Sequence, residues 1–213
     1  MMRRITAEAI AAMEKPFRVN FVNSLSGFKS SNLIGTADKH GNTNLAMFSS
    51  AVHLGADPAL IGLVSRPRSV ERHSVENLLE TEYYTINHVN RRILKAAHQT
   101  AARYDRDVSE FKAVGLTPEF RNGFHAPFVM ESQLSLAMKL LECKHIEINN
   151  TEFIIGEIQE VFMRHDVVKS DGYVDIERLG TVAGSGLDSY HSTERIGRLS
   201  YAKPDQEPRW LED

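Results

Sequence analysis

The sequence predicts a mainly β fold, an antiparallel barrel or sandwich with helical insertions in the middle of the chain. Segments with the alternating or apolar pattern of strands are separated by turn residues, which favours hairpins between neighbouring strands. A regular alternation of strands and helices, typical of doubly wound parallel sheets, is missing. The 213 residues, 42% of them hydrophobic, suffice for one large core. Because no stretch resembles a linker, we expect a single domain over residues 1–213.

The first third of the chain is predicted to hold one helix followed by strands. Thr6 can cap a short helix that runs to about Glu14 and that Pro16 ends. The turn residues 38–42 predict a hairpin, with Gly41 able to adopt a positive φ. The predicted strands of this part cover residues 17–21, 33–37, 44–49 and 59–64.

The middle of the chain is predicted to be helical, and the part after it returns to strands. Ser69 can cap a helix to about Glu80, and Asn90 can cap another through about Ala102. Asp107 and Glu110 have the spacing of a capping box before a short helix. The further predicted strands cover residues 83–87, 134–140 and 153–162, with a hairpin turn at 149–151 and an irregular segment from 171 onward. Leu140 and Leu141 break the alternation, which predicts a bulge or corner.

Charge and cysteine content exclude several classes of function. The net charge of −3 combines both signs without a basic patch, which argues against a nucleic-acid partner. No apolar run reaches the ~18 residues of a membrane span, and no signal peptide is recognisable. Cys143 is the only cysteine, so no intrachain disulfide can form and we expect a buried, inert thiol. We expect a cytoplasmic protein without a metal site.

Several polar residues follow two neighbouring strands in a pattern that fits a local anion site. Ser49 and Ser50 end one strand, and Arg66 follows the next. Arg72-His73-Ser74 opens the helix after it, where free backbone N–H groups and the helix dipole favour negative charge. A guanidinium adds charge-assisted bonds to a phosphate. The residues alone also fit an ordinary capped surface helix with solvated arginines.

An ordered set of short motifs spans most of the chain: Gly35-Thr36, Gly41, Asn44-Leu45-Ala46-Met47-Phe48-Ser49, Asp57-Pro58-Ala59-Leu60, Arg72-His73-Ser74-Val75-Glu76-Asn77-Leu78, Glu110-Phe111, Gly115-Leu116-Thr117-Pro118, Glu142-Cys143-Lys144, Gly156-Glu157-Ile158, Asp188-Ser189-Tyr190 and Tyr201-Ala202-Lys203-Pro204. In this order the motifs resemble those of the flavin-reductase-like proteins, which bind FMN. Each motif is weak alone, whereas the ordered set is specific.

This resemblance implies an FMN-binding split β-barrel and a homodimer with FMN near the subunit interface. It places the FMN phosphate against Arg72, His73 and Ser74. The strand end Phe48-Ser49-Ser50 would border the isoalloxazine ring, with backbone N–H groups near its N5 and O4 edge. Arg66 is a further candidate near the phosphate or the ribityl chain.

The implied activity is that of an NAD(P)H-dependent flavin reductase, in which hydride passes from a nicotinamide to FMN. No side chain is assigned a proton-transfer role. One alternative is an FMN-bearing, flavoredoxin-like electron carrier that a partner protein reduces. Another is a split-barrel protein that binds a different ligand or only dimerises. The sequence leaves open whether FMN is held tightly or exchanges, which nicotinamide is used, and which acceptor receives the electrons.

Overall fold

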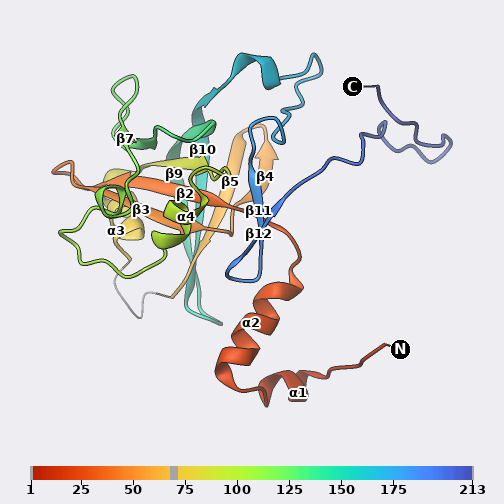
Figure 1. Ribbon diagram of the computed structural model, residues 1–213, viewed down its shortest axis with the longest axis horizontal. Helices are drawn as coiled ribbons and strands as arrows, with labels where there is room; N and C mark the ends of the chain where they lie inside the picture. Colours follow the sequence, from red (N-terminus) through yellow and green to blue (C-terminus); the bar gives the residue numbers. More distant parts are fainter. Residues whose placement is uncertain (1, 68–71, 213) are drawn as a thin grey trace.

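The computed structural model describes residues 2–67 and 72–212, and it is mainly β (Figure 1). The strands are β1 (Lys29–Ser30), β2 (Asn32–Ala37), β3 (Thr43–Phe48), β4 (Val52–Ala56), β5 (Ala59–Ser65), β6 (Tyr83–His88), β7 (Pro118–Glu119), β8 (Phe128–Val129), β9 (Leu134–Ile146), β10 (Thr151–Met163), β11 (Val182–Ser185) and β12 (Ser189–Ser192). The helices are α1 (Ala7–Ala11), α2 (Lys15–Leu25), α3 (His73–Thr81), α4 (Leu94–Gln99), α5 (Glu110–Val114) and the 3-10 turn η1 (His165–Val167).

A seven-stranded antiparallel sheet forms the body, in the order β3-β2-β6-β9-β10-β5-β4. If the sheet were flat, six strand spacings would separate the edge strands β3 and β4 by about 29 Å. The chain joins these two edges through residues 49–51 alone, which span at most about 14 Å. The sheet must therefore roll up. Among the described residues no ladder pairs β3 with β4, so the roll is open at this seam.

The long hairpin of β9 and β10 carries the sheet from one side of the roll to the other. β6 pairs with residues 135–139 of β9, whereas β5 pairs with residues 152–157 of β10. These two segments lie largely in different halves of the hairpin, and the ladder of β9 with β10 shifts register near the point where they meet. Ile155 is opposite Glu142 and Gly156 is opposite Leu140, which leaves Leu141 as the extra residue of a bulge. The bulge predicted at Leu140 and Leu141 is confirmed.

Both faces of the sheet are buried along β2, where all six residues are inaccessible. Ile34 belongs to the core inside the roll, together with Leu63, Leu78 and Met138. Leu33 points to the opposite face and packs in a second core with Phe111. α4 and α5 cover that second face, because their apolar residues belong to the same cluster. The packing of α4 and α5 on this face thus fixes the positions of the loops that follow these two helices.

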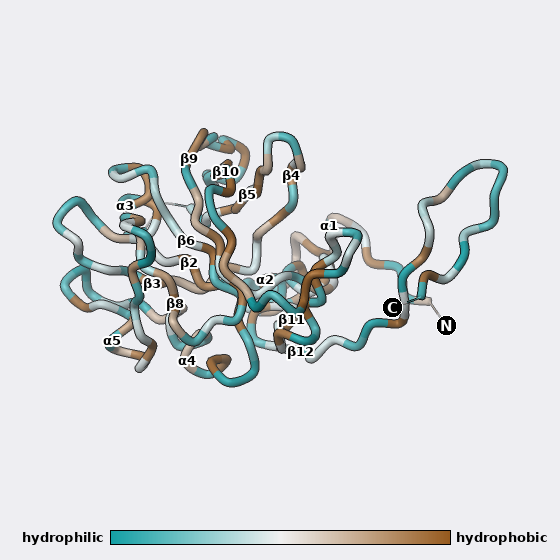
Figure 2. Tube along the Cα trace, turned by 90° about the horizontal axis from the view of Figure 1, so that it is seen from above, coloured by the Kyte–Doolittle hydropathy of each residue, from teal (hydrophilic) through white to brown (hydrophobic). Residues whose placement is uncertain are grey.

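Two segments, which we call arms, extend from the body (Figures 1 and 2). The N-terminal arm consists of α1, α2 and the residues up to Phe28, and neither helix has a buried residue. The C-terminal arm, residues 196–211, folds back on itself: the Ser200 N–H donates to the Arg209 carbonyl and the Leu211 N–H to the Arg198 carbonyl, both at 2.8 Å. β11 and β12 form a small sheet with β1 between the body and the arms.

The mainly β prediction with antiparallel hairpins is confirmed, as are the turn at residues 38–42 and the Thr6 cap of α1. The strand predicted over residues 17–21 is wrong, because this segment forms α2. It lies outside the sheet, where a strand would find no partner, whereas a helix satisfies its own backbone groups. Pro16 does not end a helix as predicted but stands in the first turn of α2.

Further local predictions differ from the structure in their boundaries. α4 begins at Leu94 rather than directly after Asn90, whose side chain instead accepts from the Arg92 N–H at 2.9 Å. The capping box at Asp107 and Glu110 is wrong, because Ser109 precedes α5 and no side chain caps the helix. The predicted cap Ser69 lies outside the described residues. No helix within the described ranges is long and apolar enough to cross a membrane.

Candidate functional site

A cleft of about 810 Å³ opens beside the seam of the rolled sheet. The ends of β3 and β5, the start of α3, the loop 100–106 and the last turns of α2 line it. The seven residues proposed from the sequence all belong to its wall: Phe48, Ser49, Ser50, Arg66, Arg72, His73 and Ser74. The fold thus brings together residues that are up to 26 positions apart in the chain. The volume of the cleft is within the range of small-molecule sites.

Positive charge gathers at the α3 end of the cleft. Burial, followed by the nearby charges of Arg66 and Arg103, lowers the pKa of the Arg72 guanidinium. The Nε atom of Arg72 is buried without a hydrogen-bond partner among the described residues. A buried, unpartnered donor between like charges is unfavourable unless an anion neutralises it. The arrangement therefore fits a phosphate group, for which guanidinium groups supply charge-assisted bonds.

A buried hydrogen-bond chain supports the start of α3 from below. Oε2 of Glu110 accepts from the Leu45 N–H and from the Asn44 side-chain amide, both at 3.0 Å. Oδ1 of Asn44 lies 3.5 Å from the Ser74 hydroxyl, which donates to it. Burial raises the pKa of Glu110, while the hydrogen bond from Leu45 opposes the shift. This chain ties β3 to the α3 residue expected to contact phosphate.

The strand end at Ser49 and Ser50 presents backbone donors to the cleft. In the described parts of the chain, no backbone carbonyl accepts from the N–H of either serine. The Ser50 hydroxyl donates to the Val64 carbonyl at 2.7 Å and accepts from the Val64 N–H at 3.1 Å. The Ser50 side chain thus fixes the seam to β5, which leaves its backbone N–H available for a ligand. Phe48 contributes apolar wall, since it packs against the core inside the roll.

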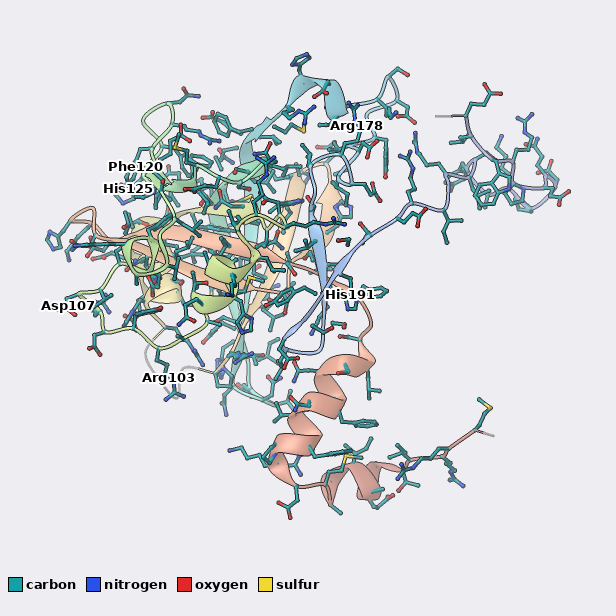
Figure 3. The ribbon with its side chains drawn as sticks, viewed as in Figure 1. Arg103, Asp107, Phe120, His125, Arg178 and His191 are labelled. Carbon is teal, nitrogen blue, oxygen red and sulfur yellow. The ribbon has the colours of Figure 1, made fainter. Side chains whose placement is uncertain are left out.

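Some residues of the site could not be found from the sequence motifs. Arg103 reaches the cleft from the loop after α4, and Figure 3 shows it at the lower edge of the body. Asn44 and Glu110 are positions of the family motifs, but the sequence assigned no site role to Asn44 and the wrong one, a capping box, to Glu110. A buried carboxylate opposite a strand's N–H groups has no local sequence signal. Lys29 also lines the cleft, with its amine donating to the Asn23 and Gly186 carbonyls at 3.2 and 2.7 Å.

His98 and Cys143 have structural partners outside the cleft wall. Nδ1 of His98 lies 2.7 Å from the Tyr190 hydroxyl, which joins α4 to β12. The expectation of a buried Cys143 is wrong, because its side chain is only half-buried; Sγ lies 3.7 Å from Oε2 of Glu152. Within the described ranges no group of three His, Cys, Asp or Glu side chains could hold a metal ion.

Comparison with known proteins identifies the family. The model of the flavin reductase like domain matches residues 25–178, most of the chain. The chain belongs to this family. A provisionally assigned flavin reductase with a split barrel domain from Shewanella frigidimarina is 52% identical, with a TM-score of 0.91, over 94% of this chain and all of that one. The recognition made from the sequence motifs is therefore confirmed.

Two more distant solved structures share the fold, and a further match is seen in sequence. Nitrilotriacetate monooxygenase component B from Bacillus cereus is 17% identical, with a TM-score of 0.81, over 93% of this chain and 99% of that one. Flavoredoxin from Desulfovibrio vulgaris is 21% identical, with a TM-score of 0.67, over 84% and 92% of the two chains. An uncharacterised protein from Aquifex aeolicus is 24% identical over 74% of this chain and 80% of its own length.

Proposed function

We propose that this member of the flavin reductase like family binds FMN in the cleft and is an NAD(P)H-dependent flavin reductase. The observation that carries the proposal is the group of arginines at the start of α3, where Arg72 is partly desolvated beside Arg66 and Arg103. A dianionic phosphate would relieve the repulsion among these charges. An uncharged ligand would leave it in place.

The residues of the cleft divide into those that would bind and those that would tune. Arg66, Arg72, His73 and Ser74 would hold the phosphate, and Phe48 would form an apolar wall for the ring system. The N–H groups of Ser49 and Ser50 would donate to the polar edge of the ring. When bound, FMN supplies the redox chemistry by accepting a hydride from the nicotinamide. Donors placed where negative charge develops favour the reduced state.

The proposed fold and assembly follow the family. We propose that the rolled sheet is a split barrel, which the 52% identity to the Shewanella protein supports. We also propose a homodimer with FMN near the interface, and a cytoplasmic location. A particle mass near twice the 24.0 kDa of one chain in light scattering is the expected result. A single-chain mass at micromolar concentration would contradict the dimer.

The visible absorption spectrum of the purified protein tests the function. We expect flavin bands, or their appearance on adding FMN, and bleaching of these bands when NADH or NADPH is added without oxygen. A protein that takes up no FMN would contradict the proposal. FMN that stays oxidised with both nicotinamides would instead indicate an electron carrier reduced by a partner protein.

A further inference from the structure

The two arms expose apolar side chains that the rest of the protomer leaves uncovered. Phe17, Leu25 and Phe28 of the N-terminal arm and Ile196, Tyr201 and Trp210 of the C-terminal arm are 61–95% exposed. Together with the other exposed valines and leucines of both arms, these side chains expose an area on the order of 1,000 Å² to solvent. That area exceeds the roughly 800 Å² that each partner contributes to a typical stable interface.

Neither arm has the internal contacts to remain folded unaided. α2 has 11 residues with none buried, and isolated helices shorter than about 12–15 residues are marginal in water. The C-terminal arm is a two-stranded hairpin, with a bridge between Leu199 and Trp210, and such hairpins are also marginal alone. Both arms therefore need a surface that covers them whenever the protein is folded.

The body holds both arms in fixed directions. The Lys29 amine ties the end of α2 to the β11–β12 turn through the Asn23 and Gly186 carbonyls. The Arg198 guanidinium stacks 4.3 Å from the centre of the Tyr173 ring and pairs with Asp171 at the root of the C-terminal arm. In Figure 1 α2 leaves the body at the bottom and the C-terminal arm extends to the upper right, and in Figure 2 both lie to the right of the sheet. His191 of β12 lies between them (Figure 3).

The chemistry of the arms favours a second copy of this chain as the occupant. A partner that must always be present is most simply the protein itself, and two-fold symmetry would use each arm twice. From residue 196 to the C-terminus, the three basic side chains of Arg198, Lys203 and Arg209 meet four acidic ones, Asp205, Glu207, Glu212 and Asp213. The C-terminal arm, which carries the exposed Trp210, therefore offers no attraction to nucleic acid or an anionic membrane.

We propose that the two arms clasp a second copy of this chain, with Trp210 as an anchor of the contact. The Trp210 ring lies across the backbone of Gly197, where an added Cβ would stand 2.6 Å from it. One face of the ring is thus held, and the ring is 65% exposed. Since Val22 and Asn23 of α2 and Ser26 directly after it line the cleft, the partner also fixes one wall of the flavin site. This inference rests on the homodimer proposed above.

Trp210 is the only tryptophan, so its fluorescence reports on the clasp directly. We would measure acrylamide quenching of the full-length, FMN-loaded protein beside its mass by light scattering, with the urea-unfolded chain as the reference for an exposed ring. We expect a dimer whose quenching constant is several-fold below that of the unfolded chain. A dimer with fully quenchable Trp210 would overturn the clasp while leaving the dimer standing. A monomer would overturn both.

Truncating the anchor provides the second test. L199A combined with W210A should raise the dimer dissociation constant at least about tenfold, because central aromatic anchors dominate such contacts. F120A is the matched control: Phe120 is an exposed aromatic residue on the opposite side of the body (Figure 3) and should leave the dimer unchanged. A dissociation constant within twofold of the parent for L199A/W210A would refute the clasp. FMN uptake, read from the visible spectrum, reports separately on the proposed function.

Discussion

Replacing Glu110 by alanine or by glutamine separates the two roles that its buried carboxylate can have. Alanine removes the acceptor of two donors, the Leu45 N–H and the Asn44 amide. Each donor left without a partner costs about 1–2 kcal/mol, since water from the cleft can replace part of the bond, so E110A should lose about 2–4 kcal/mol. For a chain of this size, such a loss lowers Tm by about 10 °C.

Glutamine is the matched variant, because both donors bind the same oxygen, Oε2. A glutamine carbonyl can take its place, and the variant no longer buries a negative charge. We therefore expect E110Q to melt at or above the parent temperature. FMN should bind E110Q as tightly as the parent or tighter, since removing an anion from the cleft favours a phosphate. E110A should bind FMN more weakly, because Asn44 no longer holds Ser74 in place.

The pH dependence of stability gives an independent check of the buried charge. Because burial raises the pKa of Glu110, the folded protein keeps a proton that the unfolded chain has lost. The free energy of unfolding should thus fall as the pH rises from about 4.5 through the folded pKa, and E110Q should lack this fall. Urea unfolding at several pH values measures it. The reasoning is refuted if E110Q loses as much stability as E110A, or if E110A melts with the parent.

Three further predictions concern the flavin and the core. R72A combined with S74A should weaken FMN binding at least tenfold, since a charge-assisted bond contributes ~1.5–3 kcal/mol, whereas riboflavin, which lacks the phosphate, should bind parent and variant equally in a fluorescence titration. S50P removes a backbone donor and should lower the flavin reduction potential in a redox titration, whereas S50A, which loses only the bonds to Val64, should keep the parent potential. If S50P has the same potential as the parent, this N–H does not tune the flavin. Burial lowers the pKa of His88 to about 4, so between pH 7 and pH 5 the unfolded chain gains a proton that the folded protein does not. Urea unfolding should therefore show a loss of about 2 kcal/mol in the free energy of unfolding over this pH range, which H88Q should not show. The same loss in H88Q would contradict this explanation.

The amino-acid sequence alone determined the local features that carry their own signals. In the turn at residues 38–42, the Asp38 carboxylate accepts from the His40 and Asn42 N–H groups, and Gly41 has a φ of 85°. Such contacts lie within a few residues, so the turn chemistry is readable in the chain. The bulge at Leu141 was equally visible, because it interrupts an alternation of apolar residues. The family motifs likewise indicated the cleft residues from Phe48 to Ser74.

The tertiary structure alone decided features that depend on distant neighbours. Residues 17–21 have spacings compatible with a strand or a helix, and only the missing partner strand selects the helix. Glu110 was expected to cap its own helix, yet its carboxylate binds donors of β3, 65 residues away. Arg103 joins Arg66 and Arg72 only because the sheet rolls and brings their loops to one cleft. Hydrogen bonds and charge–charge contacts between remote segments arise only when the chain packs. No local sequence pattern indicates which remote segments will come into contact.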